Sequence, residues 1–232
     1  MKIHMLVEGP SEKVFLELWT PRFLPDHELR VHPHQGKGKL PRANELGKPP
    51  DPKRRGLLDQ LPAKLSAFGK SADPRDECIV VLIDADTDDP TQLRDQLDEL
   101  LSRLDRRPAV KFCLAIEELE AFYLGDLKAL KSAYPNHNHE LARTYVPDSI
   151  CNTWEVFGKV IGDDGGNKVA WAETMGPKVT TKPKQSRSPS FKAFCGDLES
   201  LTQSTSASPT RQRKPRKAGA ATPKDASGKR RR

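Results

Sequence analysis

The residues best suited to chemistry are the carboxylates of the run Asp84-Ala85-Asp86-Thr87-Asp88-Asp89. They directly follow residues 79–83, five aliphatic residues that predict a short buried strand. The acidic run is therefore expected at the carboxyl end of a central strand, which is where open α/β sheets bind their ligands. Carboxylates this close together repel one another unless a cation neutralises them. The first hypothesis is a divalent metal site.

Two more acidic groups follow other expected strands. They are Glu8 and Glu12 after residues 3–7, and Glu117, Glu118 and Glu120 after residues 109–116. Because the carboxyl ends of parallel strands lie at one edge of a sheet, the three groups can converge there. Of Glu118 and Glu120, one is expected to face solvent. Oxygen ligands favour Mg²⁺ or Mn²⁺ over zinc, and two such ions would permit in-line displacement at a phosphodiester.

The acidic run also allows simpler or different roles than a metal site. Asp88 and Asp89 precede a helix expected to begin near Pro90, where carboxylates are favoured by the helix dipole, and Asp89 is assigned that role. An EF-hand loop is excluded, because its sixth and twelfth positions would be Asp89 and Asp95 in place of Gly and Glu. The string Asp84-Ala85-Asp86-Thr87 also matches the DxDxT motif of haloacid-dehalogenase-type phosphatases. That motif normally follows the first strand, so this enzyme class is kept only as an alternative.

Hydrophobic periodicity predicts strands that alternate with helices. Strands are expected over 3–7, 29–34, 78–83 and 109–116, and helices over 12–24, 57–68, 91–104 and 117–124. This alternation predicts an α/β domain of residues 1–125, with a mostly parallel sheet flanked by helices on both faces. Weaker helical patterns over 126–133, 148–160, 167–175 and 189–202 predict a helical extension, residues 126–202, packed on that domain.

Charge is distributed unevenly along the 232 residues, of which 35% are hydrophobic. Residues 203–232 contain ten Lys or Arg and one acidic residue, so the rest of this +7 chain has a formal net charge of −2. The same segment has almost no apolar bulk, which predicts a disordered tail. Such a polycation would either add salt-dependent affinity for nucleic acid or be only a disordered end.

Cysteine spacing and hydropathy indicate a cytoplasmic location. The four cysteines are far apart and form no CxxC pair, so neither a zinc ribbon nor a disulfide framework is expected. Cys78 and Cys113 are expected in the core. Residues 1–7 are too short an apolar run for a secretory signal, and no stretch is long enough to span a bilayer.

Basic segments could supply nucleic-acid contacts. Gly36-Lys37-Gly38-Lys39 would let backbone N–H groups and ammonium groups approach a phosphate, although it is not a Walker A motif. Residues 36–56 contain seven Lys or Arg, and residues 178–192 contain five and no acidic residue. A solvated loop is the alternative for both segments. The candidate contact residues are Lys37, Lys39, Arg54, Arg55, Lys184 and Arg187.

Two histidines and two tryptophans are assigned ordinary roles. His32 and His34 share a face if 29–34 is a strand, and polar contacts are favoured over metal binding because no cysteine is near and the other ligands are hard oxygens. Trp19 and Trp154 fall at apolar helical spacing and are expected in the core.

Several of these motifs together resemble known families. Val7-Glu8-Gly9 followed by Ile83-Asp84-Ala85-Asp86-Thr87-Asp88 resembles the TOPRIM domain of topoisomerases, primases and OLD-type (overcoming lysogenisation defect) nucleases. Further stretches are similar to the family of domain of unknown function 4276 (DUF4276), and the similarity extends over about residues 1–200. These stretches are Leu6-Val7-Glu8-Gly9-Pro10-Ser11-Glu12, His32-Pro33-His34-Gln35-Gly36-Lys37-Gly38-Lys39-Leu40, Ile116-Glu117-Glu118-Leu119-Glu120-Ala121-Phe122 and Arg187-Ser188-Pro189-Ser190-Phe191.

The resemblance implies a TOPRIM-like α/β fold and Mg²⁺-dependent (or Mn²⁺-dependent) cleavage of phosphodiesters in DNA or RNA. It assigns Glu8, Asp84 and Asp86 as metal ligands or acid/base groups. Glu12, Asp88 and Glu117 would complete the shell or orient water. From the residues themselves, Lys37 or Lys39 would stabilise charge on the transferred phosphoryl group.

The resemblance also implies a place in phage or mobile-element defence, beside an ATPase partner. No topoisomerase or primase accessory domain fits in 232 residues, so strand passage and primer synthesis are not expected. The alternative is a non-catalytic TOPRIM-fold partner or regulator of an ATPase that docks nucleic acid or protein. This alternative predicts no metal binding at Asp84 and Asp86.

Overall fold

The computed structural model describes residues 1–42, 51–86, 88–116, 118–149, 152–163 and 165–206, with side chains described to residue 202. The first part of the chain alternates strands and helices: β1 (Lys2–Val7), α1 (Pro10–Phe23), β2 (Glu28–Pro33), α2 (Leu57–Ser71), β3 (Glu77–Asp84), α3 (Pro90–Ser102) and β4 (Val110–Ala115). Helices follow: α4 (Glu120–Gly125), α5 (Leu127–Ala133), α6 (His139–Thr144), α7 (Thr153–Ile161), α8 (Lys168–Met175), the 3₁₀ turn η1 (Pro183–Gln185) and α9 (Pro189–Ser206).

The strands of the described chain form one four-stranded sheet, in the order β2-β1-β3-β4, and every pairing is parallel. The predicted α/β class with a mostly parallel sheet is therefore confirmed. From β1 the chain turns to one side to form β2 and later returns to the other side to form β3. The order of the strands thus reverses between β1 and β3, where doubly wound folds bind their ligands at the carboxyl edge.

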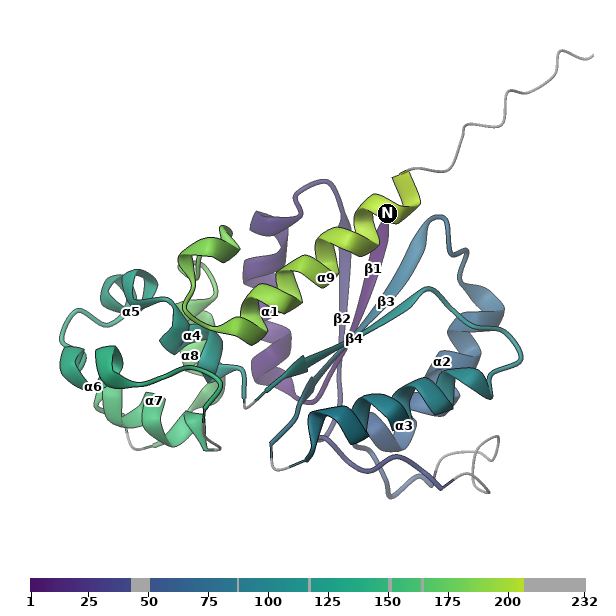
Figure 1. The fold of residues 1–232 in the computed structure, drawn as a ribbon, viewed down its shortest axis with the longest axis horizontal. Coiled ribbons are helices and arrows are strands. Elements are labelled where there is room, and N and C mark those ends of the chain that lie inside the picture. The colour runs from purple at the N-terminus through teal and green to yellow at the C-terminus, as the bar shows by residue number, and fades with distance from the viewer. Residues whose placement is uncertain (43–50, 87, 117, 150–151, 164, 207–232) are drawn as a thin grey trace, which may run out of the picture.

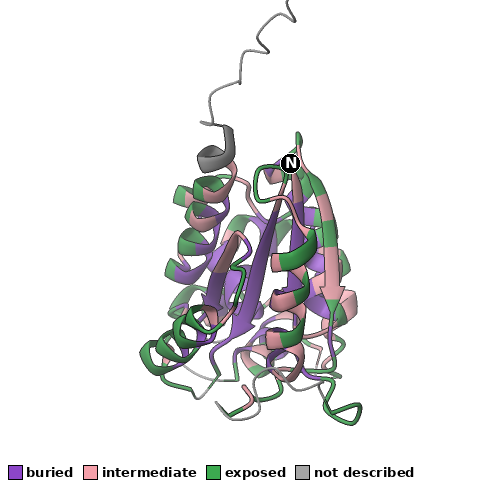
Figure 2. Ribbon diagram, turned by 90° about the vertical axis from the view of Figure 1, so that its right-hand side faces the viewer, coloured by how far each residue is buried: buried purple, intermediate pink, exposed green. Residues whose placement is uncertain are grey.

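Two hydrophobic cores lie on opposite faces of the sheet, as the alternation of side chains along a strand requires. On one face α1 and α9 cover residues such as Met5 and Val80. On the other face α2 and α3 cover residues such as Val81 and Ile83. The predicted helices on both faces are thus present (Figure 1). The strands β1 and β3 are buried almost throughout, and the exposed residues lie mainly on the helices and loops (Figure 2).

The later helices pack on the sheet and on one another. Helix α9 packs against β4, α8 packs against α1, and α7 packs against α4. Trp19 is fully buried where these elements meet, and its Nε1 donates a hydrogen bond to the carbonyl oxygen of Thr180 at 3.0 Å. The expected core position of Trp19 is confirmed, whereas Trp154 is only half-buried. Cys78 and Cys113 are buried, as expected.

The structure differs from the expected elements mainly after residue 116. Helix α4 begins at residue 120 instead of 117, and α6 and η1 were not expected. Helix α7 begins at residue 153 instead of 148, because Asp148 and Asn152 have left-handed backbone conformations that interrupt a helix. The carboxylate of Asp148 accepts hydrogen bonds from the backbone N–H and the hydroxyl of Ser190, at 2.7 Å each. Asp148 thus bonds to the start of α9 and does not itself belong to a helix.

In the part of the chain that the structure describes, no helix is both long enough and apolar enough to cross a bilayer.

Candidate functional site

Two acidic residues far apart in the sequence meet at the point where the strand order reverses. Glu8 follows β1 directly, and Asp84 is the last residue of β3. Glu8 Oε1 accepts a hydrogen bond from the backbone N–H of Asp84 at 2.9 Å. The Asp84 residue is only 9% exposed. The predicted convergence of the first two acidic groups is therefore present at the carboxyl edge of the sheet.

Glu12 and Glu120 lie beside this pair. Glu12 belongs to the first turn of α1 and is 7% exposed, and Glu120 begins α4 and is 2% exposed. The Ser11 hydroxyl donates to Glu12 Oε1 at 3.1 Å. Glu12 Oε2 and the Tyr123 hydroxyl are buried and have no hydrogen-bond partner among the described residues. We call Glu8, Glu12, Asp84 and Glu120 the inner acidic group.

Burial controls the ionisation of the inner acidic group. It raises the pKa of Glu8 to about 7, against the opposing effect of the Asp84 N–H. It also raises the pKa of Glu120 to about 7, against the attraction of the Lys168 ammonium. The pKa of Asp84 is raised well above its usual range by burial and then by the charges of Glu8 and Glu12. Without a cation, Glu8, Asp84 and Glu120 therefore retain protons near neutral pH.

A second acidic group lies further out and already contacts a cation. Lys37 Nζ donates to the carbonyl oxygen of Ala85 at 2.8 Å and to Asp86 Oδ2 at 3.2 Å, and lies 2.7 Å from Asp88 Oδ2. Burial lowers the pKa of Lys37, but the carboxylates of Asp88 and Asp86 outweigh it and raise the pKa overall. We call Asp86 and Asp88 the outer acidic pair, with Lys37 as its counter-ion.

Backbone contacts hold Lys37 at the edge of the sheet. Gly36 has a left-handed φ of 82°, which favours glycine, and its N–H donates to the Glu8 carbonyl oxygen at 2.8 Å. The Gly36 carbonyl accepts from Leu57 N–H at 2.8 Å, and the Lys37 carbonyl accepts from Leu58 N–H at 2.7 Å. The Gly36-Lys37 turn thus links the end of β1 to the start of α2 and aims Lys37 at the acidic run.

The donors for a metal ion are present at this edge, but they do not converge into a finished site. Among the described residues, no three side chains of His, Cys, Asp or Glu are placed to hold one ion together. The inner acidic group still fits a hard cation, because it offers only oxygen donors and leaves buried oxygens of Glu12 and Tyr123 without partners. Glu117, the remaining predicted ligand, lies outside the described residues.

Glu118 and Lys168 close the site on the side of the later helices. Glu118 accepts hydrogen bonds from the Trp154 backbone N–H at 2.9 Å and from Lys168 Nζ at 3.1 Å, and its side chain is 13% exposed. The expectation that either Glu118 or Glu120 faces solvent was therefore wrong, because α7 and α8 cover both. Lys168 was not predicted, since nothing in its local sequence connects it with carboxylates fifty residues earlier.

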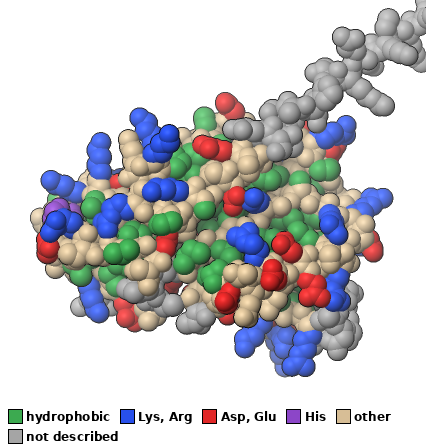
Figure 3. Space-filling view, in the orientation of Figure 1, with side chains coloured by type: hydrophobic (Ala, Val, Ile, Leu, Met, Phe, Trp, Pro, Cys, Tyr) green, Lys and Arg blue, Asp and Glu red, His purple; other side chains and the backbone are tan. Residues whose placement is uncertain are grey.

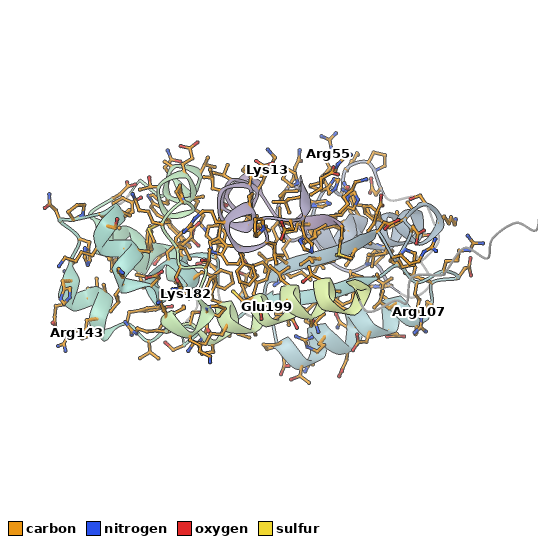
Figure 4. All side chains as sticks on the ribbon, turned by 90° about the horizontal axis from the view of Figure 1, so that it is seen from above. Lys13, Arg55, Arg107, Arg143, Lys182 and Glu199 are labelled. Atoms are coloured by element: carbon orange, nitrogen blue, oxygen red, sulfur yellow. The ribbon has the colours of Figure 1, made fainter. Side chains whose placement is uncertain are left out.

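The predicted basic residues lie in two separate places. Lys39, Arg54 and Arg55 are exposed on the loop between β2 and α2, and Figure 3 shows Lys and Arg side chains gathered at that lower edge. Lys184 is exposed in η1, within a segment that also contains Lys182. Figure 4 shows Arg55 and Lys182 well apart on the molecule.

Arg187 has structural partners. Its guanidinium donates to the carbonyl oxygen of Ala142 at 3.2 Å and to that of Tyr145, near the end of α6. These bonds join the segment before α9 to the end of α6. Contact of Arg187 and of the other candidate residues with nucleic acid stays a prediction.

The remaining polar residues have the ordinary roles expected of them. Asp89 is the N-cap of α3, and its carboxylate accepts from the N–H groups of Thr91 and Gln92 at 2.8 and 3.0 Å. His34 Nδ1 donates to the Val7 carbonyl oxygen at 2.7 Å, and His32 Nε2 lies 3.1 Å from the Nδ1 of His4.

Comparison with known proteins agrees with the similarity to the DUF4276 family described above. No curated protein matches the chain. The sequence profile of a domain of unknown function, DUF4276, matches residues 7–199. The match includes every described residue of the inner acidic group and of the outer acidic pair. Because it extends over most of the 232 residues, the chain belongs to the DUF4276 family.

Proposed function

We propose that this protein is a Mg²⁺-dependent or Mn²⁺-dependent phosphodiesterase acting on nucleic acid, as in TOPRIM nucleases. The observation that carries the proposal is the link between Glu8 and Asp84, which places a partly buried and a buried carboxylate together at the ligand-binding edge of a parallel sheet. Buried carboxylates are costly unless they are paired, protonated or bound to a cation. That the fold bears this free-energy cost at one edge of the sheet supports a functional role for these carboxylates.

Glu8, Asp84 and Asp86 would hold the metal ion, and Asp88 and Glu12 would complete its surroundings. Once bound, the ion would supply positive charge to the phosphodiester and lower the pKa of a water molecule. The ion would have to compete with Lys37 for Asp86 and Asp88, since all three contacts of Lys37 lie in the acidic run.

The protein side chains would position water and the phosphate. Glu12 Oε2, buried and without a partner among the described residues, would accept a hydrogen bond from the attacking water. Lys37, once displaced from the outer acidic pair, would donate to a phosphoryl oxygen and offset its charge.

A second function is favoured by a different observation. Lys37 already forms ion pairs with Asp86 and Asp88, and no three described side chains of His, Cys, Asp or Glu form a metal site. These facts favour a non-catalytic module that docks nucleic acid or protein, for instance as a regulator of an ATPase. The nuclease proposal allows an ATPase partner as well, in phage or mobile-element defence.

Cleavage and metal binding separate the two functions. Purified full-length protein would be incubated with supercoiled DNA, single-stranded DNA and tRNA, with and without Mg²⁺ or Mn²⁺. The nuclease proposal expects metal-dependent cleavage that Asp84→Asn abolishes and Asp89→Asn retains, because Asn is as good an N-cap as Asp. Equal cleavage by wild type and Asp84→Asn would exclude it. Titration calorimetry with Mn²⁺ would support the docking module if no binding is detected.

A further inference from the structure

A hollow of about 460 Å³ lies at the end of α1 that is far from the inner acidic group. Glu12 is in the first turn of this helix and Arg22 is in its last turn, and the 14 residues of the helix extend over about 20 Å. The other walls of the hollow are α5 and the loop of residues 177–182 between α8 and η1. We call this feature the α5 hollow. It is separate from the candidate site described above.

Basic residues dominate the lining of the α5 hollow. Its charged residues are Arg22, Lys128, Lys178 and Lys182, together with one acidic residue, Asp126. The three lysines are exposed, and their ammonium groups form no ion pair or hydrogen bond with any residue that the structure describes. Since like charges gathered around one hollow repel one another, an anion bound between them would be stabilised.

The carboxylate of Asp126 is occupied by other bonds. Its Oδ1 accepts from the Ala129 N–H at 2.9 Å, and its Oδ2 accepts from the Thr180 N–H at 2.8 Å. The residue is only 5% exposed. Asp126 therefore joins the start of α5 to the loop, and it forms no ion pair with the lysines of the hollow.

The loop that carries two of the lysines is held in place by bonds of its own. Arg22 Nη1 donates to the carbonyl oxygens of Gly176 and Val179 at 3.0 Å each. Trp19 Nε1 donates to the carbonyl oxygen of Thr180 at 3.0 Å. Because these acceptors are neutral carbonyl groups, Arg22 keeps its positive charge. A loop ordered in this way lowers the conformational cost of binding a ligand.

Further hydrogen-bond donors of the α5 hollow are also available. The hydroxyl groups of Ser132 and Thr181 and the backbone N–H of Thr181 have no partner in the described part of the chain. The Thr180 hydroxyl, by contrast, donates to Gln185 Oε1 at 3.0 Å. Ammonium groups combined with free hydroxyl and N–H donors suit an anion that has several acceptor oxygens.

From this combination we propose that the α5 hollow binds a small anion with two or three linked phosphate groups, such as a polyphosphate or the phosphate chain of a nucleotide. Its volume lies within the roughly 300–1,000 Å³ typical of small-molecule sites. Four basic residues and one acidic residue give the lining a net charge of +3. A single phosphate group carries at most about two negative charges near neutral pH, so linked phosphates match this charge better.

The lining also indicates which part of the ligand is recognised. None of its described residues is aromatic, so the hollow offers no ring on which a base could stack. The ligand would be held through its phosphates, and a nucleoside attached to them would contribute little. Arg22 and Lys128 come from elements far from the loop in sequence and converge with it on one hollow. This convergence favours a compact anion over an extended nucleic-acid strand.

Titration calorimetry with inorganic triphosphate tests the inference on the full-length protein. The buffer would contain EDTA, so that no metal ion binds the carboxylates or the triphosphate, and salt at about 0.15 M, which largely screens charges more than about 8 Å apart. The hollow variant would be Lys178→Gln/Lys182→Gln. The matched control would be Lys70→Gln/Lys159→Gln, which removes two exposed charges from α2 and α7. Neither the inference nor this test depends on the proposed nuclease activity.

We expect the hollow variant to bind triphosphate at least about tenfold more weakly than wild type, and the control to change by less than about twofold. ATP should bind wild type about as tightly as triphosphate does, and inorganic phosphate at least about tenfold more weakly. A second variant, Ser132→Trp, should weaken triphosphate binding by filling the hollow without changing its charge. Equal losses in the hollow and control variants would overturn the inference.

The melting temperature shows whether the ligand binds the folded chain. Triphosphate should raise it in wild type and in the control but not in the hollow variant, because only binding that requires the folded state stabilises it. Positive charges that bind triphosphate equally well in the unfolded chain have no such effect. If wild type binds no triphosphate, yet the hollow variant binds oligo(dT) more weakly than the control does, the hollow belongs to a nucleic-acid surface and the polyphosphate inference is wrong.

Discussion

Glu8 Oε1 and the backbone N–H of Asp84 are joined by a hydrogen bond of 2.9 Å between residues 76 positions apart. The bond connects the end of β1 with the end of β3 at the place where the strand order reverses. It also shows how the site holds the partly buried carboxylate of Glu8, since the Asp84 N–H partly offsets the effect of burial on the Glu8 pKa. The first prediction concerns the partner in this bond.

Replacing Asp84 with Asn should stabilise the fold and remove metal binding. Asp84 is buried near Glu8 and Glu12, so its ionisation is opposed at neutral pH and above. We expect Asp84→Asn to raise the free energy of unfolding at pH 8 by about 1–3 kcal/mol, measured by urea denaturation. Asp89→Asn, the same change at an exposed helix cap, should leave stability within about 0.5 kcal/mol. A loss of stability in Asp84→Asn would contradict this account of the site.

Replacing Lys37 should make the site bind metal more tightly. In the structure Lys37 Nζ contacts Asp86 and Asp88 and so competes with any other cation. Lys37→Met removes that competitor, and we expect its Mn²⁺ affinity to rise by about tenfold, equivalent to about 1.4 kcal/mol. Titration calorimetry at pH 7.5 would measure the change. Lys37→Arg keeps the positive charge and should bind Mn²⁺ about as wild type does, and unchanged affinity in Lys37→Met would argue against direct competition.

Stability should fall as the pH rises through the range in which Glu120 ionises in the folded chain. The pKa of this buried carboxyl is raised from 4.5 to about 7, so between these values the folded chain binds more protons than the unfolded chain. The contribution is complete below pH 4.5 and lost as pH passes 7. For this group the change amounts to at most about 3 kcal/mol.

Glu120→Gln should make the pH dependence of stability shallower between pH 5 and 8, measured by thermal or urea denaturation. Glu199, labelled in Figure 4, is an exposed carboxylate on α9, and Glu199→Gln serves as the matched control. We expect the control to follow the wild-type pH profile. An identical profile for Glu120→Gln and wild type would show that Glu120 is not the group responsible.

Arg187 should matter for folding more than its position in a basic segment indicates. Its guanidinium donates to the carbonyl groups of Ala142 and Tyr145 at the end of α6. We expect Arg187→Ala to lower the free energy of unfolding by about 1–3 kcal/mol, measured by urea denaturation. Lys184→Ala, an exposed neighbour in η1, should change it by less than about 0.5 kcal/mol. Equal effects of the two changes would contradict the structural role.

The sequence by itself determined the α/β class and the place of the main carboxylates. Short aliphatic runs rich in β-branched residues, such as 79–83, are typical of central strands, and this predicted Asp84 at a carboxyl edge, where it lies. The sequence also predicts that Asp89 lies at the start of a helix. This role can be seen in sequence because an N-cap carboxylate bonds to N–H groups two and three residues later. Local patterns of this kind are visible in sequence because the groups that interact are near neighbours.

Only the tertiary structure decided which charges meet across the molecule. Lys37 and the outer acidic pair are separated by about fifty residues, and so are Lys168 and Glu118. These contacts depend on how the loop after β2 lies at the edge of the sheet and how α7 and α8 pack on α4 and α1, which no local spacing encodes. The burial of Glu120 is of the same kind: an acidic residue at a helix start is usually solvated, and here later helices cover it.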